Sequence, residues 1–205
     1  LLNRRYGLAL DQFSALSKID VDNDNYLTMI GDLHKLQKQW NKSIDYFLRA
    51  FEVNPQNFKA LESALQVSLS VELYEKAEEI CKKLVLHNSN NSSYWLTYKQ
   101  ITAYNKNYES TLIAISELER IEGETITLTL EKSAVMQELN DIDNAIKILF
   151  ENHDPDSANL EIVKRLVSLH LEKENFFDAN IFNKILLREF SDDPSGYINA
   201  AIISL

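Results

Sequence analysis

A small side chain recurs with a fixed 34-residue period along the whole chain. The positions concerned are Ala9, Ser43, Ala77, Thr111, Ala145 and Ala179. A position that holds only small side chains is typical of a place where two helices cross closely, because a larger side chain would separate them. The recurrence therefore predicts a series of similar units, each as long as this period.

Other positions recur in the same phase. Three residues before each small side chain lie Tyr6, Trp40, Tyr74, Tyr108, Ile142 and Phe176. Four residues after it lie Phe13, Phe47, Cys81, Ile115, Leu149 and, out of pattern, Asn183. A further apolar position holds Leu27, Leu61, Trp95, Thr129, Val163 and Tyr197, with Thr129 as the exception. Several positions thus repeat together with no insertion between them.

The composition indicates that these units are helical. The 205 residues include only 4 Gly and 3 Pro, fewer than a β-sandwich or an α/β enzyme needs for its turns. The scarcity of glycine also excludes glycine-rich phosphate-binding loops. We therefore predict an all-α fold with short, repeated connections.

One unit, residues 24–57, resembles the tetratricopeptide repeat, a 34-residue helix–turn–helix motif. The residues that carry the resemblance are Leu27, Ile30, Gly31, Trp40, Phe47, Ala50 and Pro55, whereas His34 and Ser43 depart from the usual Tyr and Ala. The resemblance implies an α-solenoid, a right-handed superhelix of stacked helix–turn–helix repeats. Each repeat would bury its apolar face only against its neighbours.

The 34-residue period predicts the layout of the chain as a single array. Complete repeats are expected at 24–57, 58–91, 92–125, 126–159 and 160–193, after the second helix of a partial repeat in 1–23 and before the start of a further one in 194–205. First helices are expected at 25–37, 59–71, 93–105, 127–139 and 160–173. Second helices are expected at 41–53, 75–87, 109–121, 143–152 and 177–189. Because both ends fall inside repeats, we expect the chain to be a piece of a longer protein.

The resemblance also implies a concave groove, lined mainly by first helices, that binds an extended peptide or a helix. The groove residues it selects are Thr28, Asp32, Lys35, Lys59, Glu62, Ser63, Gln66, Leu96, Gln100, Tyr104, Lys164 and Arg165. A clamp for a terminal carboxylate needs several converging cationic and amide donors. The mixture of charges at these positions does not favour one. The mixture of amide, hydroxyl and apolar groups suits backbone hydrogen bonding with a few apolar anchors. The alternative is that these positions are simply solvated.

Charge and cysteine content limit the partners and the compartment. The net charge of −10 argues against nucleic acids and anionic membrane surfaces. All of it lies in the range 101–205, as a solvated surface or as a docking face for a basic partner. No stretch approaches the length of about 18 apolar residues that a membrane span needs. The single Cys81 is compatible with the cytoplasm and with the cell envelope or periplasm. The Asn-, Lys- and Ile-rich composition resembles that of tetratricopeptide proteins of low-GC bacteria, such as the envelope-associated ones of Bacteroidetes.

No catalytic, cofactor-binding or metal site is predicted. His34 and His170 have no metal-ligand spacing and are interpreted as structural residues, and Cys81 as part of the core. The acidic stretch 20–25 begins like a calcium loop, but Asn25 and Gly31 stand where such a loop needs Gly and Glu. Asn41-Lys42-Ser43 matches the glycosylation pattern, but Ser43 is expected to be buried.

The function predicted is therefore that of a non-catalytic scaffold, which docks a partner protein or segment within a larger assembly. Two alternatives stay open: a receptor for short peptides or tails in the groove, and a regulatory domain of a larger enzyme or signalling protein. The sequence gives no indication of the oligomeric state.

Overall fold

In the computed structural model, residues 2–204 are described, and they form twelve α-helices and no β-strand. Leu1 and Leu205, the outermost residues of the expected segments 1–23 and 194–205, lie outside the described residues. The helices group into two compact units, Leu1–Lys106 and Asn107–Leu205, which are described separately below. The predicted solenoid of helix pairs is confirmed.

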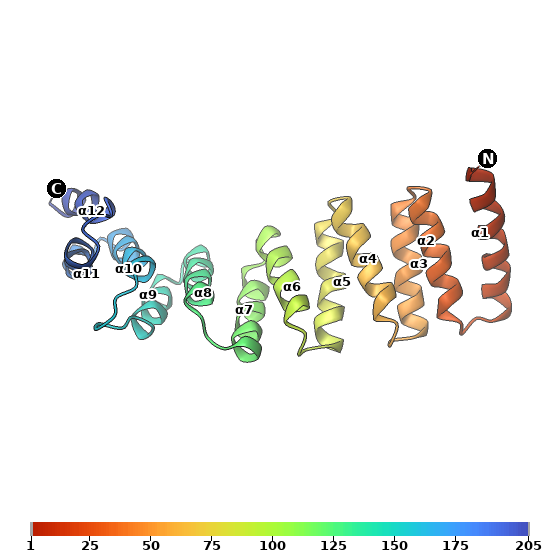
Figure 1. The fold of residues 1–205 in the computed structure, drawn as a ribbon, viewed down its shortest axis with the longest axis horizontal. Coiled ribbons are helices and arrows are strands. Elements are labelled where there is room, and N and C mark those ends of the chain that lie inside the picture. Colours follow the sequence, from red (N-terminus) through yellow and green to blue (C-terminus); the bar gives the residue numbers. More distant parts are fainter. Residues whose placement is uncertain (1, 205) are drawn as a thin grey trace. The chain divides into compact units, whose positions relative to one another are not determined.

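Unit 1 contains six helices, drawn from red to yellow-green in Figure 1. They are α1 (Leu2–Ile19), α2 (Asp24–Leu36), α3 (Trp40–Val53), α4 (Phe58–Ser70), α5 (Tyr74–His87) and α6 (Ser92–Tyr104). Each helix packs against the next one in the chain. Asn side chains begin the first helices: Asn23, Asn57 and Asn91 accept hydrogen bonds from N–H groups of the first turns of α2, α4 and α6. Such caps satisfy backbone donors that have no partner within the helix.

Unit 2 contains the other six helices. They are α7 (Tyr108–Glu122), α8 (Ile126–Glu138), α9 (Ile142–Glu151), α10 (Leu160–Glu172), α11 (Phe176–Glu189) and α12 (Ser195–Ile203). Consecutive helices again pack together, and α10 also contacts α8 and α12. The buried core of this unit lies between α9, α10 and α11, around Leu149, Leu166 and Leu186.

The ten helices for which we expected ranges begin and end within one residue of them. The boundary between the two units falls in the turn from α6 to α7, two helices that share the expected repeat 92–125. The division of the chain into repeats at the stated boundaries stays a prediction.

The same period is also present in the backbone conformation of the turns. Positive φ angles occur at Lys38, Glu72, Lys106, Asn140 and Glu174, with values from 56° to 61°. Each of these residues lies between the two helices of a pair. In the first turn, the N–H groups of Lys38 and Gln39 donate to the carbonyl oxygens of Lys35 and His34, at 3.0 and 2.9 Å. The left-handed residue thus ends the first helix and reverses the chain.

Five of the six recurrent small side chains lie in the interior of the structure, whereas Ala9 is half-buried. Ser43, Ala77, Ala145 and Ala179 are fully buried, and Thr111 nearly so. The Ser43 hydroxyl donates to the carbonyl oxygen of Gly31 on the facing helix, at 2.8 Å. A Cβ atom on Gly31 would lie 2.8 Å from ring atoms of Phe47. The backbones of α2 and α3 therefore approach as closely as their side chains permit.

The two departures from the apolar pattern, Thr129 and Asn183, are also buried. The Asn183 amide donates to the carbonyl oxygen of Gly196 in the first turn of α12, at 2.9 Å. Gly196 in turn packs against Leu186 and Leu187 of α11. A polar side chain stands at this interior position because it binds the backbone of the next helix.

The Gly31 contact yields a stability prediction. Gly31→Ala should lower the free energy of unfolding by about 1–3 kcal/mol, because the buried Phe47 ring has no room for an added methyl group. Gly7→Ala is the matched control, since nothing lies within 4 Å of a Cβ atom there. The control should gain about 0.5–1 kcal/mol from the better helix propensity of alanine. Urea unfolding followed by circular dichroism measures both, and a stabilised Gly31→Ala variant would contradict the packing argument.

Candidate functional site

Ten of the twelve predicted groove residues lie in unit 1, on three first helices. We call them the first-helix face: Thr28, Asp32 and Lys35 on α2, Lys59, Glu62, Ser63 and Gln66 on α4, and Leu96, Gln100 and Tyr104 on α6. All ten are exposed or half-buried. The core positions of α4, such as Leu61 and Ala64, are fully buried. Helical periodicity separates the two sets, because residues four apart share a face.

Hydrogen bonds connect the first helices of unit 1 to one another. The Asn57 amide at the start of α4 donates to a carboxylate oxygen of Asp24 at 2.5 Å and to the Thr28 hydroxyl at 3.2 Å. The Tyr94 hydroxyl of α6 donates to a carboxylate oxygen of Glu62 on α4. These bonds fix α2, α4 and α6 side by side, and they engage Thr28 and Glu62 within the protein.

The Tyr94–Glu62 hydrogen bond keeps its polarity throughout the neutral range. Burial raises the pKa of Tyr94 to about 12, and the hydrogen bond to Glu62 and its negative charge act in the same direction. The phenol therefore stays protonated and acts as the donor. This contact positions the two helices and offers no reactive group.

The amides of Gln66 and Gln100 are polar groups of this face that are available to a ligand. Both side chains are exposed, and within the described part of the chain neither has a hydrogen-bond partner. Large apolar side chains accompany them: Met29 is 45% exposed and Leu96 is 43% exposed. An amide both donates and accepts hydrogen bonds, as a peptide backbone requires. The first helices of unit 1 thus present both amides that can bind a peptide backbone and exposed apolar side chains.

The charged residues of the first-helix face do not converge on one point. Lys35 pairs with Asp32 on its own helix, 3.6 Å apart. The ring of Tyr104 packs in a tilted orientation against Tyr74 at the start of α5, with ring centroids 4.1 Å apart, and so covers the turn of the preceding helix pair.

Lys164 and Arg165, the other two predicted groove residues, lie on α10 in unit 2 and bind partners there. The Lys164 ammonium donates to Asp193 at 2.7 Å, and an Arg165 Nη2 group donates to the amide oxygen of Gln137 on α8 at 2.5 Å. Lys164 is also 3.9 Å from Glu161. Both cations therefore hold neighbouring elements of unit 2 together.

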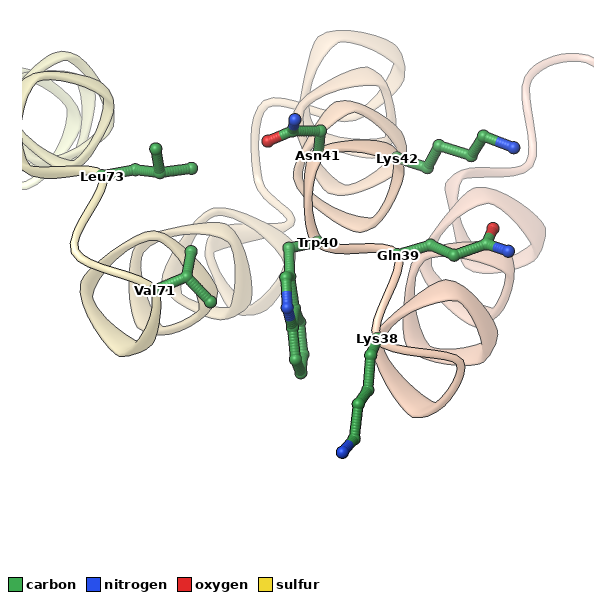
Figure 2. Close-up of a pocket in the computed structure, with 7 residues that line it drawn as sticks. All are labelled: Lys38, Gln39, Trp40, Asn41, Lys42, Val71 and Leu73. Carbon is green, nitrogen blue, oxygen red and sulfur yellow. The ribbon is translucent and has the colours of Figure 1, made fainter.

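Sequence reasoning missed a cavity at the turn edge of unit 1. This cavity, the Trp40 pocket, has a volume of about 500 Å³ and is lined by Lys38, Gln39, Trp40, Asn41, Lys42, Val71 and Leu73. Figure 2 shows the indole of Trp40 projecting from the start of α3, with Val71 directed toward it. A cavity of about 400 Å³ lies one repeat further along, around Tyr74. The sequence does contain a signal for the difference between the two cavities. The first helix of the next repeat ends in Ser70 at the Trp40 pocket and in Tyr104 at the cavity around Tyr74.

The residues weighed for other chemistry are structural. His34 is buried and its Nδ1 atom lies 2.7 Å from the Gln39 side-chain oxygen. His170 is buried against Phe182, and burial lowers its pKa. Burial raises the pKa of Cys81 to about 12, so its thiol stays neutral and unreactive. Ser43 is buried as expected. Asn23, in the acidic stretch 20–25, begins α2.

The described residues contain neither a cluster suited to a metal ion nor a helix suited to span a membrane. Among residues 2–204, no group of three or more His, Cys, Asp or Glu side chains is placed to hold a metal ion. None of the described helices combines the length and apolar character that crossing a membrane requires.

Comparison with known proteins identifies the fold. No family model matches the sequence, and no curated protein matches it. The chain resembles a chain in the structure of Naa15/Naa10 bound to HypK-THB, with a TM-score of 0.71 and 13% identity over 97% of its length. It also resembles YrrB, described as a TPR protein with an unusual peptide-binding site, with a TM-score of 0.55 and 12% identity. The chain has the fold of tetratricopeptide-repeat proteins.

The two likenesses differ in extent. The matched region covers 97% of the YrrB chain and 92% of this one. In the Naa15/Naa10 structure, by contrast, this chain spans only 32% of the length of the chain it matches. The chain thus corresponds to nearly all of the YrrB chain and to about a third of the chain in the Naa15/Naa10 structure.

The Lys164–Asp193 pair yields a pH prediction. Hydrogen bonds from Lys164 and from Ser195 lower the pKa of Asp193 to about 2. A lowered carboxyl pKa contributes stability that is present above about pH 4 and is lost as the pH falls toward 2. Asp193→Asn should therefore weaken the acid dependence of unfolding in this range, whereas Asp192→Asn, its exposed neighbour, should not. Urea unfolding between about pH 2 and 7 measures the difference, and identical acid slopes for Asp193→Asn and wild type would contradict the assignment.

Proposed function

We propose that this protein is a non-catalytic scaffold that docks a partner polypeptide on the first-helix face of unit 1, within a larger assembly. The observation that carries the proposal is the pair of exposed amides, Gln66 and Gln100, on two first helices joined by the Tyr94–Glu62 hydrogen bond, together with the exposed apolar side chains Met29 and Leu96 on first helices. Such a surface suits an extended backbone with a few apolar side chains.

The structural neighbours support the class of activity without identifying the partner. One is part of a multi-protein complex, Naa15/Naa10 with HypK, and the other is described as having a peptide-binding site. Both properties belong to those proteins. These two neighbours make a protein or peptide the first choice of ligand for this fold. Docking of a protein or a peptide does not require a cofactor.

A receptor for short peptides is the second candidate, and it shares the same face. The two functions differ in what the isolated face can bind. A peptide receptor must bind a short segment by itself, whereas a scaffold can need surface on either side of the face. A regulatory domain of a larger enzyme would use the same docking chemistry within a longer chain.

Replacing both amides tests the docking face. Gln66→Ala with Gln100→Ala should weaken partner binding about tenfold, because each lost hydrogen bond contributes about 0.5–1.5 kcal/mol. The control is Glu79→Ala with Lys82→Ala, at two exposed positions on the second helix α5. Affinity capture from the source cells with each variant as bait, quantified by mass spectrometry, gives the comparison.

The outcome separates the candidates. Partners that the amide variant loses and the control keeps support docking on the first-helix face. If both variants capture the same proteins equally, the face is not the docking surface. If a library of short peptides shows no binding while a protein partner survives the amide substitutions, the peptide receptor is excluded.

A further inference from the structure

The Trp40 pocket is an open aromatic site outside the first-helix face. Trp40 is the first residue of α3, and its indole is only half-buried. In Figure 2 the indole and the Lys38 side chain extend to the same side of the turn, whereas Lys42 and Gln39 extend away from the indole. Val71 borders the indole from the following turn. One apolar flank of the ring is therefore accessible.

At the equivalent site one repeat further, the ring that corresponds to the Trp40 indole is covered by another aromatic ring. Tyr74, which takes the place of Trp40 there, begins α5, and the ring of Tyr104 packs on it at a centroid distance of 4.1 Å and an interplanar angle of 41°. The Asn105 amide next to it donates to the Tyr74 carbonyl oxygen at 3.2 Å and to Glu78 at 2.7 Å. The ring of Tyr74 thus has an internal ligand.

Trp40 lacks this cover because of a single residue. The position of Tyr104 is taken by Ser70, whose hydroxyl donates to the Val67 carbonyl oxygen of its own helix at 2.8 Å. A serine side chain has no ring to lay against the indole. The larger cavity, about 500 Å³ against about 400 Å³ at Tyr74, is consistent with this difference.

The two sites also differ in charge. The charged residues that line the Trp40 pocket are Lys38 and Lys42, both cationic. The site at Tyr74 has Glu72 in place of Lys38, and it is further lined by Glu75 and Lys76. An indole face attracts cations, but the Lys38 ammonium, on the same side of the turn as the indole, opposes them and favours carboxylates instead.

We propose that the Trp40 pocket binds an aromatic side chain of a partner polypeptide, flanked by acidic residues. The aromatic ring takes the position toward Trp40 that Tyr104 takes toward Tyr74, and the flanking carboxylates face Lys38. This site goes beyond the docking proposed for the first-helix face, and neither depends on the other.

Nuclear magnetic resonance of the isotope-labelled full chain tests the proposal directly. The probe is a short peptide, acetyl-Glu-Asp-Tyr-Asp-Glu-amide, added at low ionic strength. The indole N–H signal of Trp40, assigned by its loss in Trp40→Phe, should shift in a saturable way. The chain provides an internal control in Trp95, which is buried and whose indole N–H donates to the Ser89 carbonyl oxygen at 2.8 Å. Its signal should not move.

Two control peptides separate the contributions of ring and charge. Replacing Tyr by Ala in the probe, or its acidic residues by Lys, should each weaken binding at least about tenfold, which is the effect of losing about 1.4 kcal/mol. Equal binding of the lysine peptide would overturn the charge argument. The absence of any Trp40 shift with the acidic peptide would overturn the proposal as a whole.

Ser70→Tyr is the decisive variant, because it supplies the cover that Tyr104 provides one repeat further. It should shift the Trp40 signal without peptide and reduce peptide binding at least about tenfold. Leu86→Tyr adds the same ring at an exposed position of α5 and should bind like wild type. In the reverse experiment, Tyr104→Ser should uncover Tyr74 without creating a site for the acidic peptide, because Glu72 and Glu75 line that cavity.

The remaining outcomes are also informative. Wild-type affinity in a folded Ser70→Tyr variant would overturn the pocket assignment. If the Trp40 signal shifts with protein concentration in the absence of peptide, the occupant of the pocket is a second copy of this chain, and the proposed partner polypeptide is overturned. Gln66→Ala with Gln100→Ala should leave this peptide binding unchanged, so a failure here is distinguishable from a failure of the first-helix face.

Discussion

The close approach of two helices at a small side chain is the contact on which the rest of the structure depends. In the first complete helix pair, Ser43 of α3 lies against the backbone of α2, and its hydroxyl binds the Gly31 carbonyl. The approach brings Phe47 against Gly31 with no space left. Because such contacts are local, each pair is stabilised mainly by itself and its neighbours, as in other repeat proteins. The turn within a pair must then reverse the chain within a few residues, which explains the left-handed residue at the same place in each of the five pairs from α2 to α11.

The period of the sequence was sufficient to predict the helices because it records this packing directly. Small, aromatic and aliphatic positions that share the period correspond to interior positions of successive pairs, and α3 begins and ends within one residue of its expected range. The turns were less predictable. Left-handed residues are usually Gly or Asn, but Lys38 and Glu72 occupy this conformation and carry no local signal. Asn183 also departs from the apolar pattern, because its partner is the backbone of α12, which composition at one position does not reveal.

The candidate site was predictable only in part. Helical periodicity and the family resemblance placed Gln66 and Gln100 on an exposed face, and the structure leaves both side chains exposed. The same reasoning grouped Lys164 and Arg165 with them, although these cations bind Asp193 and Gln137 within unit 2. A side chain's partner depends on which residues of neighbouring helices come within reach. A repeat pattern predicts which positions of a helix are interior or exposed, but it does not predict which side chains of neighbouring helices bind each other.

The repeats also show where a solenoid can change its binding properties without changing its fold. The position of Ser43 and Ala77 is held small by packing, and a larger side chain there would separate the helices. The last residue of the first helix in the next repeat is not limited in size by this packing. It is Ser70 in α4 and Tyr104 in α6. That single difference leaves Trp40 accessible and covers Tyr74. Binding specificity in this protein is therefore expected at the helix ends and exposed faces, where the packing that defines the repeat sets no limit on the side chain.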